Sequence, residues 1–154
     1  MFNPAWWHNK QQFFTKEEES LLLQAIKLAE LSTSGEVRLF VESKCSYVDA
    51  IHRAEEIFDQ LKMQATAQRN GVLVYVAVKD QQLAIYADSG IYQALGTKYW
   101  QERVLHALTL AKQNNLALGL YDVITAVGVA LQQHFPYQAG TDKNELPDDI
   151  IFGK

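Results

Sequence analysis

The sequence predicts an α/β fold: a single-domain α/β/α sandwich in which helices cover both faces of a mixed sheet. Segments with apolar residues at helical spacing alternate along the chain with segments typical of strands, which favours both kinds of layer in one domain. Residues 72–78 are apolar throughout, as is typical of a strand covered on both faces. Only residues 79–82 separate this run from the next strand, so we expect an antiparallel hairpin.

The first predicted helix spans residues 16–31. Thr15 and Glu18 have the spacing of a capping box, in which each side chain accepts a hydrogen bond from the other residue's backbone N–H. The Ser, Thr and Gly cluster at 32–35 ends this helix, and the alternating apolar residues of 36–42 predict a strand. The buried stripe of the helix is predicted to consist of Leu22, Ala25, Ile26 and Ala29.

The second predicted helix, residues 47–63, connects the strand at 36–42 to the strand at 72–78. This β–α–β unit should be right-handed, with its two strands parallel. A strand at 83–87 completes the hairpin, and it is followed by two further predicted helices, at 98–113 and 117–133. The last helix is apolar almost all round, so we expect it to lie largely buried against the sheet.

The core domain is predicted to span residues 15–135, between an N-terminal aromatic arm (1–14) and an acidic C-terminal tail (136–154). The aromatic residues of the arm are Phe2, Trp6, Trp7, Phe13 and Phe14. Aromatic side chains are enriched at the hot spots of protein interfaces, so this arm offers anchors for a protein partner. Packing of the same rings inside the molecule is the alternative. The last apolar residues of the tail, 150–152, are expected to dock on the domain.

The composition argues against nucleic acid as a partner and against an oxidising compartment as a requirement for folding. A net charge of -4 gives no basic footprint for nucleic acid. The single cysteine, Cys45, has no partner for an intramolecular disulfide, and the first residues do not have a signal-peptide pattern. Residues 116–131 are the one candidate for a membrane segment, but they are shorter than the ~20 residues that a span requires and contain Asp122. We therefore expect a cytoplasmic protein without a membrane span, and its oligomeric state is not predicted.

Standard catalytic signatures are absent from the sequence. It lacks a phosphate-binding loop, a Gly-x-Ser-x-Gly elbow and a His-Glu-x-x-His zinc motif, which argues against the commonest NTPase, hydrolase and zinc-protease templates. Enzymes whose catalytic residues are scattered through the chain stay open. His52 and Glu56 share one face of a predicted helix, but two ligands do not close a zinc site, and a solvated helix face is the favoured interpretation.

Polar residues at three strand ends form the candidate site. The segments that enter the two parallel strands and the segment that leaves the antiparallel strand should meet at one edge of the sheet. Carboxylate, amide and guanidinium groups held there beside glycine loops could bind a hard cation or an anion. The alternative is that the glycines supply backbone freedom and the polar residues cap turns. The candidate ligand-binding residues are Ser34, Glu36, Arg69, Asn70, Asp88 and Ser89.

Three runs of the sequence together resemble the TPM domain family, which is named after a thylakoid lumen protein, a photosystem II repair protein and a receptor-associated membrane protein. The runs are residues 33–37 (TSGEV), 69–73 (RNGVL) and 84–91 (AIYADSGI). Each run is weak alone, but their order and spacing over residues 15–135 make the resemblance specific. The ending of the chain, with HFPY at 134–137 and NELPDDIIFG at 144–153, is similar to that of short bacterial members without a membrane segment.

The resemblance implies a compact α/β/α sandwich and points to two activities. Acid phosphatase activity and divalent-cation binding have been proposed for some relatives. Those relatives commonly carry carboxylates shortly after the glycine loop, where this chain has Tyr92 and Thr97. Both differences remove charge that would hold a cation.

Two functional hypotheses come from these observations. The leading one is a TPM-like protein-interaction or weak ligand-binding module that acts on a protein partner through its surface. The alternative is a metal-dependent acid phosphatase, in which Ca²⁺ or Mg²⁺ held near Asp88 and Glu36 polarises a phosphate ester and activates water. No cofactor is expected beyond these two cations.

Overall fold

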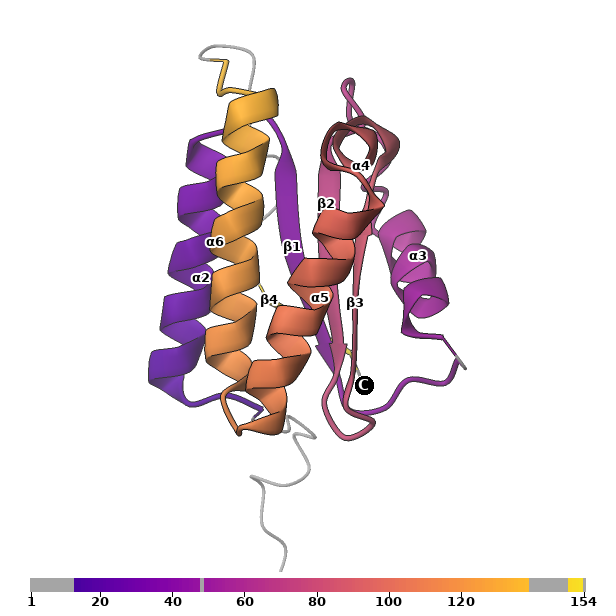
Figure 1. The fold of residues 1–154 in the computed structure, drawn as a ribbon, viewed down its shortest axis with the longest axis vertical. Coiled ribbons are helices and arrows are strands. Elements are labelled where there is room, and N and C mark those ends of the chain that lie inside the picture. The colour runs from indigo at the N-terminus through magenta and orange to yellow at the C-terminus, as the bar shows by residue number, and fades with distance from the viewer. Residues whose placement is uncertain (1–12, 48, 139–149, 154) are drawn as a thin grey trace, which may run out of the picture.

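The structure is a computed structural model that describes residues 13–47, 49–138 and 150–153 of the chain (Figure 1). Predicted features at residues 1–12 and 139–149, including Phe2, Trp6 and Trp7, lie outside the described residues. The elements in chain order are α2 (Lys16–Leu31), β1 (Glu36–Glu42), α3 (Ala50–Gln60), β2 (Gly71–Ala77), β3 (Gln82–Ala87), α4 (Ser89–Leu95), α5 (Thr97–Lys112), α6 (Leu116–His134) and β4 (Ile150–Phe152).

The four strands form one mixed sheet in the order β3-β2-β1-β4. β1 and β2 are parallel, with Glu36 opposite Gly71 and Glu42 opposite Ala77. β3 runs antiparallel to β2, and β4 runs parallel to β1. The predicted β–α–β unit and the hairpin that follows it are therefore confirmed.

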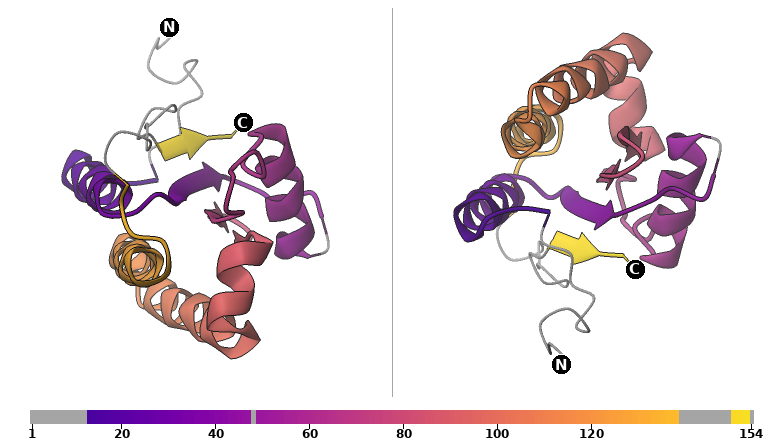
Figure 2. Two further views of the ribbon diagram at one scale, coloured as in Figure 1. Left: turned by 90° about the horizontal axis from the view of Figure 1, so that it is seen from above. Right: turned by 90° about the horizontal axis from the view of Figure 1, so that it is seen from below.

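Helices cover both faces of the sheet, as predicted. Figure 2 shows α3 on one face and α2, α5 and α6 on the other. Successive strand residues point to opposite faces, so Val37, Leu39 and Val41 of β1 join the larger core with α2 and α6. Leu73 and Tyr75 of β2 enter the smaller core beneath α3. Every residue of β2 is buried, which explains its unbroken apolar run.

The first helix has the predicted bounds and begins with the predicted capping box. The Thr15 side chain accepts from the backbone N–H of Glu18 at 3.1 Å, and the Glu18 carboxylate accepts from the N–H of Thr15 at 2.8 Å. Its buried face carries the four predicted residues, together with Phe14 of the adjoining segment in the same core. Phe13 packs against that core as well, so the described end of the aromatic arm lies on the domain.

Two elements were not predicted, and one helix is much shorter than predicted. Asp88 caps α4, a helix of 7 residues, and Gly96, with φ 84°, separates α4 from α5. β4 is 3 residues long and pairs with a strand more than a hundred positions earlier in the chain. α3 covers residues 50–60 instead of 47–63. Asp49, with an extended backbone (φ -110°), precedes its first turn, and Lys62 adopts a left-handed backbone (φ 57°) just after its end.

The apolar helix α6 packs mainly between α2 and α5 and touches the sheet at β1, so it is buried less by the sheet than expected. Gly128 allows close contact with α2, since a Cβ atom there would lie 2.8 Å from that of Ala29. α6 is also the one described helix that is long and apolar enough to cross a membrane, with a mean hydropathy of 1.4 and half of that window buried. Core helices of soluble proteins meet the same criteria.

Candidate functional site

Three chain segments meet at the upper end of the sheet, beside α4 (Figure 1). The N–H of Glu36, at the start of β1, donates to the carbonyl of Asn70 at 3.4 Å. The N–H of Asp88, just after β3, donates to the carbonyl of Gly71 at 2.9 Å. The strand ends from which the candidate site was predicted are thus neighbours in space.

Arg69 and Asp88 form a two-pronged ion pair at this edge. The guanidinium Nε and Nη2 atoms of Arg69 donate to the two carboxylate oxygens of Asp88, each at 2.7 Å. Asp88 is only 3% exposed, whereas the Arg69 side chain is 53% exposed. Hydrogen bonding to Asp88, followed by its charge, raises the pKa of Arg69. Charged, bidentate pairs of this kind are stronger than neutral hydrogen bonds.

Asp88 is also the N-cap residue of α4. Its Oδ1 atom accepts from the backbone N–H of Ser89 at 2.7 Å, while Ser89 itself is exposed. The following residue, Gly90, lies so close to the Arg69 loop that an added Cβ would be 2.2 Å from the carbonyl oxygen of Gln68. The carboxylate is therefore held by three N–H donors of the protein in a tightly packed corner.

Ser34 and Asn70 are brought together next to this pair. Asn70 is 1% exposed, and its Nδ2 atom donates to the Ser34 hydroxyl at 3.3 Å. Ser34 in turn donates to the side-chain oxygen of Gln68 at 3.0 Å. The Oδ1 atom of Asn70 is buried and has no hydrogen-bond partner among the described residues. A buried acceptor without a donor is uncommon in proteins, and it is a position where a cation, a water or a ligand N–H can bind.

Glu36 and Asp88 lie on opposite sides of β2 at this end of the sheet. β2 lies between their strands, so their backbones are two strand spacings, or roughly 10 Å, apart. Within residues 13–47, 49–138 and 150–153, no group of three His, Cys, Asp or Glu side chains is placed to hold a metal ion. Cation binding by Asp88 and Glu36 stays a prediction.

Tyr92 and Thr97, where the family resemblance implies carboxylates, touch each other. The Tyr92 hydroxyl and the Thr97 hydroxyl are 2.8 Å apart, at the junction of α4 and α5. The Tyr92 ring stacks on Trp100, with 6.3 Å between the ring centroids. Two neutral hydroxyl groups in contact here add no charge beside the Arg69–Asp88 pair.

A second polar network lies at the other end of the parallel strands, where β1 and β2 terminate. It was not predicted as a unit. Glu42 ends β1, is 4% exposed, and accepts from Nε and Nη2 of Arg53, each at 3.0 Å. The hydroxyl of Tyr75 also donates to Glu42. Burial and this hydrogen bond raise the pKa of Tyr75, so its phenol stays neutral. The network fixes α3 to the strand ends. Its members are far apart in the sequence, and the one sequence signal for it was the position of Glu42 at the end of a predicted strand.

The fold and the paired polar residues at its upper edge define a small α/β sandwich domain with a loop-built site. The chain belongs to the TPM domain family, whose family model matches residues 8–130. The predicted family membership is thus confirmed. A comparison with functionally curated proteins gives no significant match.

Solved structures support this assignment. The BA42 protein of the psychrophilic bacterium Bizionia argentinensis is 40% identical, with a TM-score of 0.82, over 94% of this chain and 98% of that one. The N-terminal domain of the cg2496 protein from Corynebacterium glutamicum is 13% identical, with a TM-score of 0.62. That match covers 77% of this chain and 74% of the other, and it supports the fold alone.

Proposed function

We propose that this TPM domain is a cytoplasmic binding module that acts on a protein partner and does not hydrolyse phosphate esters. The observation against phosphate ester hydrolysis is the ion pair in which both oxygens of Asp88 accept from Arg69. A carboxylate must offer its oxygens to a catalytic cation, and here the protein's own guanidinium occupies them. The neutral Tyr92–Thr97 contact supports the same conclusion.

An aryl phosphate assay tests this proposal. The purified chain is incubated with p-nitrophenyl phosphate at acidic and neutral pH, with Mg²⁺, Ca²⁺ or Mn²⁺. We expect no turnover above that of the matched variant Asp88→Asn, which keeps an oxygen to cap α4 but lacks the charge. Cation-dependent turnover that Asp88→Asn abolishes would overturn the proposal.

The second candidate function is a metal-dependent acid phosphatase, and the unpartnered Oδ1 atom of Asn70 favours it. This buried oxygen belongs to the residue next to Arg69 and is of the kind that coordinates Ca²⁺ or Mg²⁺. A thermal-shift titration with Ca²⁺ and Mg²⁺ tests this candidate. A cation at a hundredfold excess over its dissociation constant stabilises the native state by about 2.7 kcal/mol. Stabilisation that disappears in Asn70→Ala would support the candidate, and unchanged melting in both proteins would remove it.

A further inference from the structure

The outer edge of β3 is open in the described part of the chain, where β2 is its sole strand neighbour. The hydrogen bond from Asp88 to Gly71 fixes the ladder, because bonding alternates along an antiparallel pair. Gln82, Ala84 and Tyr86 therefore direct their backbone N–H and C=O groups at β2. The same groups of the intervening residues point outward, away from the sheet; these residues are Leu83, Ile85 and Ala87.

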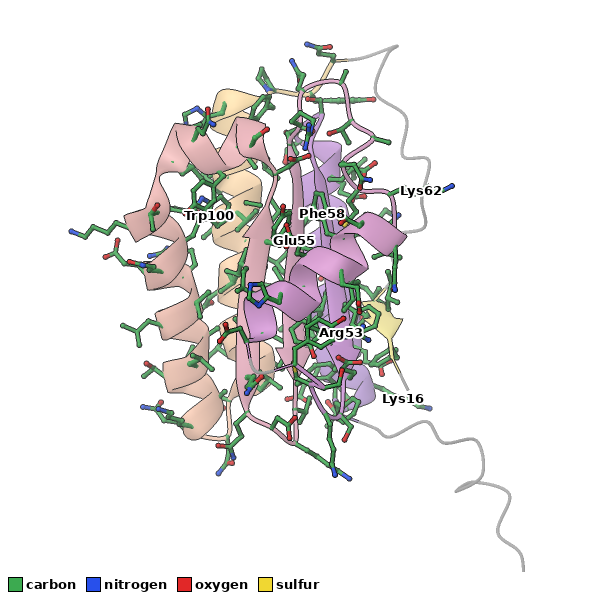
Figure 3. The ribbon with its side chains drawn as sticks, turned by 90° about the vertical axis from the view of Figure 1, so that its right-hand side faces the viewer. Lys16, Arg53, Glu55, Phe58, Lys62 and Trp100 are labelled. Atoms are coloured by element: carbon green, nitrogen blue, oxygen red, sulfur yellow. The ribbon has the colours of Figure 1, made fainter. Side chains whose placement is uncertain are left out.

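A groove of about 870 Å³ runs along this edge. Consecutive residues of β3, from Leu83 to Ala87, line it, whereas a strand seen from one face would contribute only alternate residues. The α5 wall is formed by Trp100 and Val104, and the α3 wall by Ile51. In Figure 3, Trp100 lies on one side of β3 and Glu55 on the other. The groove thus has the place and shape of one further strand between two helices.

The two walls differ in chemistry. The α5 wall is largely apolar and includes Leu105, which is 64% exposed. On the α3 side, Asp49 lines the groove. Glu55 and Asp59, which are not among the lining residues, are exposed, lie four residues apart on one helix face, and flank the lining residue Tyr86. The Glu55 carboxylate accepts from the Tyr86 hydroxyl at 3.3 Å. Burial, and after it these carboxylates, raises the pKa of Tyr86, in agreement with a negative potential on this side.

We propose that the β3 groove binds an extended segment of a partner protein in which hydrophobic residues alternate with lysine or arginine. Side chains of an added strand point alternately to its two faces. One row would meet the apolar α5 wall and the other row the carboxylates of α3, while the backbone pairs with β3. The inference rests on the proposed function and names its partner.

Other occupants fit the groove less well. A helix has no free backbone groups to pair with β3, since its own hydrogen bonds use them. A second copy would offer a β3 edge that also lies between α3 and α5, so the two strands could not approach to the ~4.8 Å of a ladder. A partner strand without such walls meets neither obstacle.

Binding of a synthetic peptide tests the proposal. The probe is a fluorescent peptide of four alternating lysine–valine pairs, and its controls are the same residues in two blocks and an alternating glutamate–valine peptide. We expect the alternating lysine peptide to bind at least tenfold more tightly than either control. Equal binding of the block peptide would mean simple charge attraction, and a shift of the protein to dimers would mean self-pairing; either result overturns the proposal.

Two variants separate the backbone contribution from the charge contribution. Ala87→Pro removes an N–H that faces the groove and leaves the β2 ladder intact, whereas Ala87→Val keeps that N–H. We expect at least tenfold weaker binding for Ala87→Pro only. Glu55→Lys should weaken the lysine peptide several-fold and strengthen the glutamate peptide. Unchanged preference in Glu55→Lys would overturn the predicted partner chemistry.

Amide hydrogen exchange on the unmodified chain keeps the test independent of how the variants fold. Peptide binding should slow exchange at Leu83, Ile85 and Ala87, while Ala84 and Tyr86 are already protected by β2. No new protection at those three amides would overturn the docking site. Hydrolysis of aryl phosphate would instead overturn the proposed function, so the two failures are distinguishable.

Discussion

Arg69 combines an unfavourable backbone with a favourable side-chain contact. Its φ of 52° is left-handed, a conformation that costs most residues about 1–2 kcal/mol and glycine almost nothing. Its guanidinium holds the buried carboxylate of Asp88 through two hydrogen bonds. The loop geometry alone would favour glycine at this position, so the arginine is explained by its side chain.

Substitutions at Arg69 should separate these two contributions. Arg69→Ala removes the ion pair and keeps the strain, whereas Arg69→Gly removes both. We expect both variants to be less stable than the unmodified chain, with Arg69→Gly more stable than Arg69→Ala by about 1 kcal/mol. Urea unfolding measures the difference. The matched control is Gln81, which has a similar φ of 53° and is exposed, so that its Gly and Ala variants differ by backbone strain alone. An Arg69→Ala variant as stable as Arg69→Gly would contradict this account.

The candidate site was predictable at the level of which residues meet, and less so at the level of what they do. Parallel and antiparallel pairing rules place Arg69 and Asp88 at one edge from sequence order alone. Whether Asp88 binds a cation or an arginine depends on the side-chain rotamers in that loop, which no local pattern encodes. The Glu42–Arg53–Tyr75 network was missed for a related reason, since its members lie on three separate elements.

At the scale of elements, the short helix α4 depends on one close approach. Its second residue, Gly90, donates its N–H to the carbonyl of Arg69 at 2.9 Å. An added Cβ would lie 2.2 Å from the carbonyl oxygen of Gln68 and 2.7 Å from that of Arg69. Backbone atoms cannot move aside as a flexible side chain does, so glycine is required for α4 to dock here.

Gly90→Ala should therefore be strongly destabilising. We expect a loss of at least about 2 kcal/mol, because overpacking of this severity forces the backbone to shift. The control is Gly96→Ala, where no atom lies within 4 Å of the added Cβ and only the left-handed φ of 84° opposes alanine. That variant should lose about 1 kcal/mol. Chemical denaturation of both variants ranks them, and a Gly90→Ala chain more stable than Gly96→Ala would refute the packing argument.

Long elements with clear periodicity were predictable, and short or distant ones were not. The bounds of the helix at 16–31 are determined by neighbouring residues, a capping box at its start and a cluster of helix-breaking residues after its end. α4 has only 7 residues, too few to display a helical stripe, and its first residues read as a turn. β4 acquires its strand conformation by pairing with β1, a contact between distant segments that sequence periodicity does not contain.

At the scale of the whole molecule, the two sides of the sheet differ in what lies beside the outermost long strand. The β1 edge is closed by β4, which places Ile150 in the main core and pairs it with Leu39. The β3 edge faces the groove between α3 and α5. Both β3 and β4 have one strand neighbour, but β3 offers 6 residues for strand addition and β4 only 3.

Removal of residues 150–154 should expose the β1 edge. We expect the free energy of unfolding to fall by about 3 kcal/mol, from the burial of one isoleucine at ~1.5–3 kcal/mol and from lost strand hydrogen bonds at ~1 kcal/mol each. Ile150→Ala is the matched control and should lose less, because its backbone pairing survives. Thermal and urea unfolding check the order, and a truncated chain as stable as Ile150→Ala would show that the strand pairing adds nothing.

The acidic α3 side of the open edge also affects how copies of this protein behave toward one another. An exposed strand edge is a hazard, because it can template aggregation between identical chains. Glu55 and Asp59 are carried by every copy, in a chain whose net charge is already -4, so two open edges that approach repel each other. This repulsion is screened by salt, with a range of about 8 Å at physiological ionic strength and 3 Å at 1 M. The carboxylates that would select a basic partner would therefore also add charge repulsion to the steric obstacle that α3 and α5 present to a second copy, and concentrated salt would remove the repulsion alone.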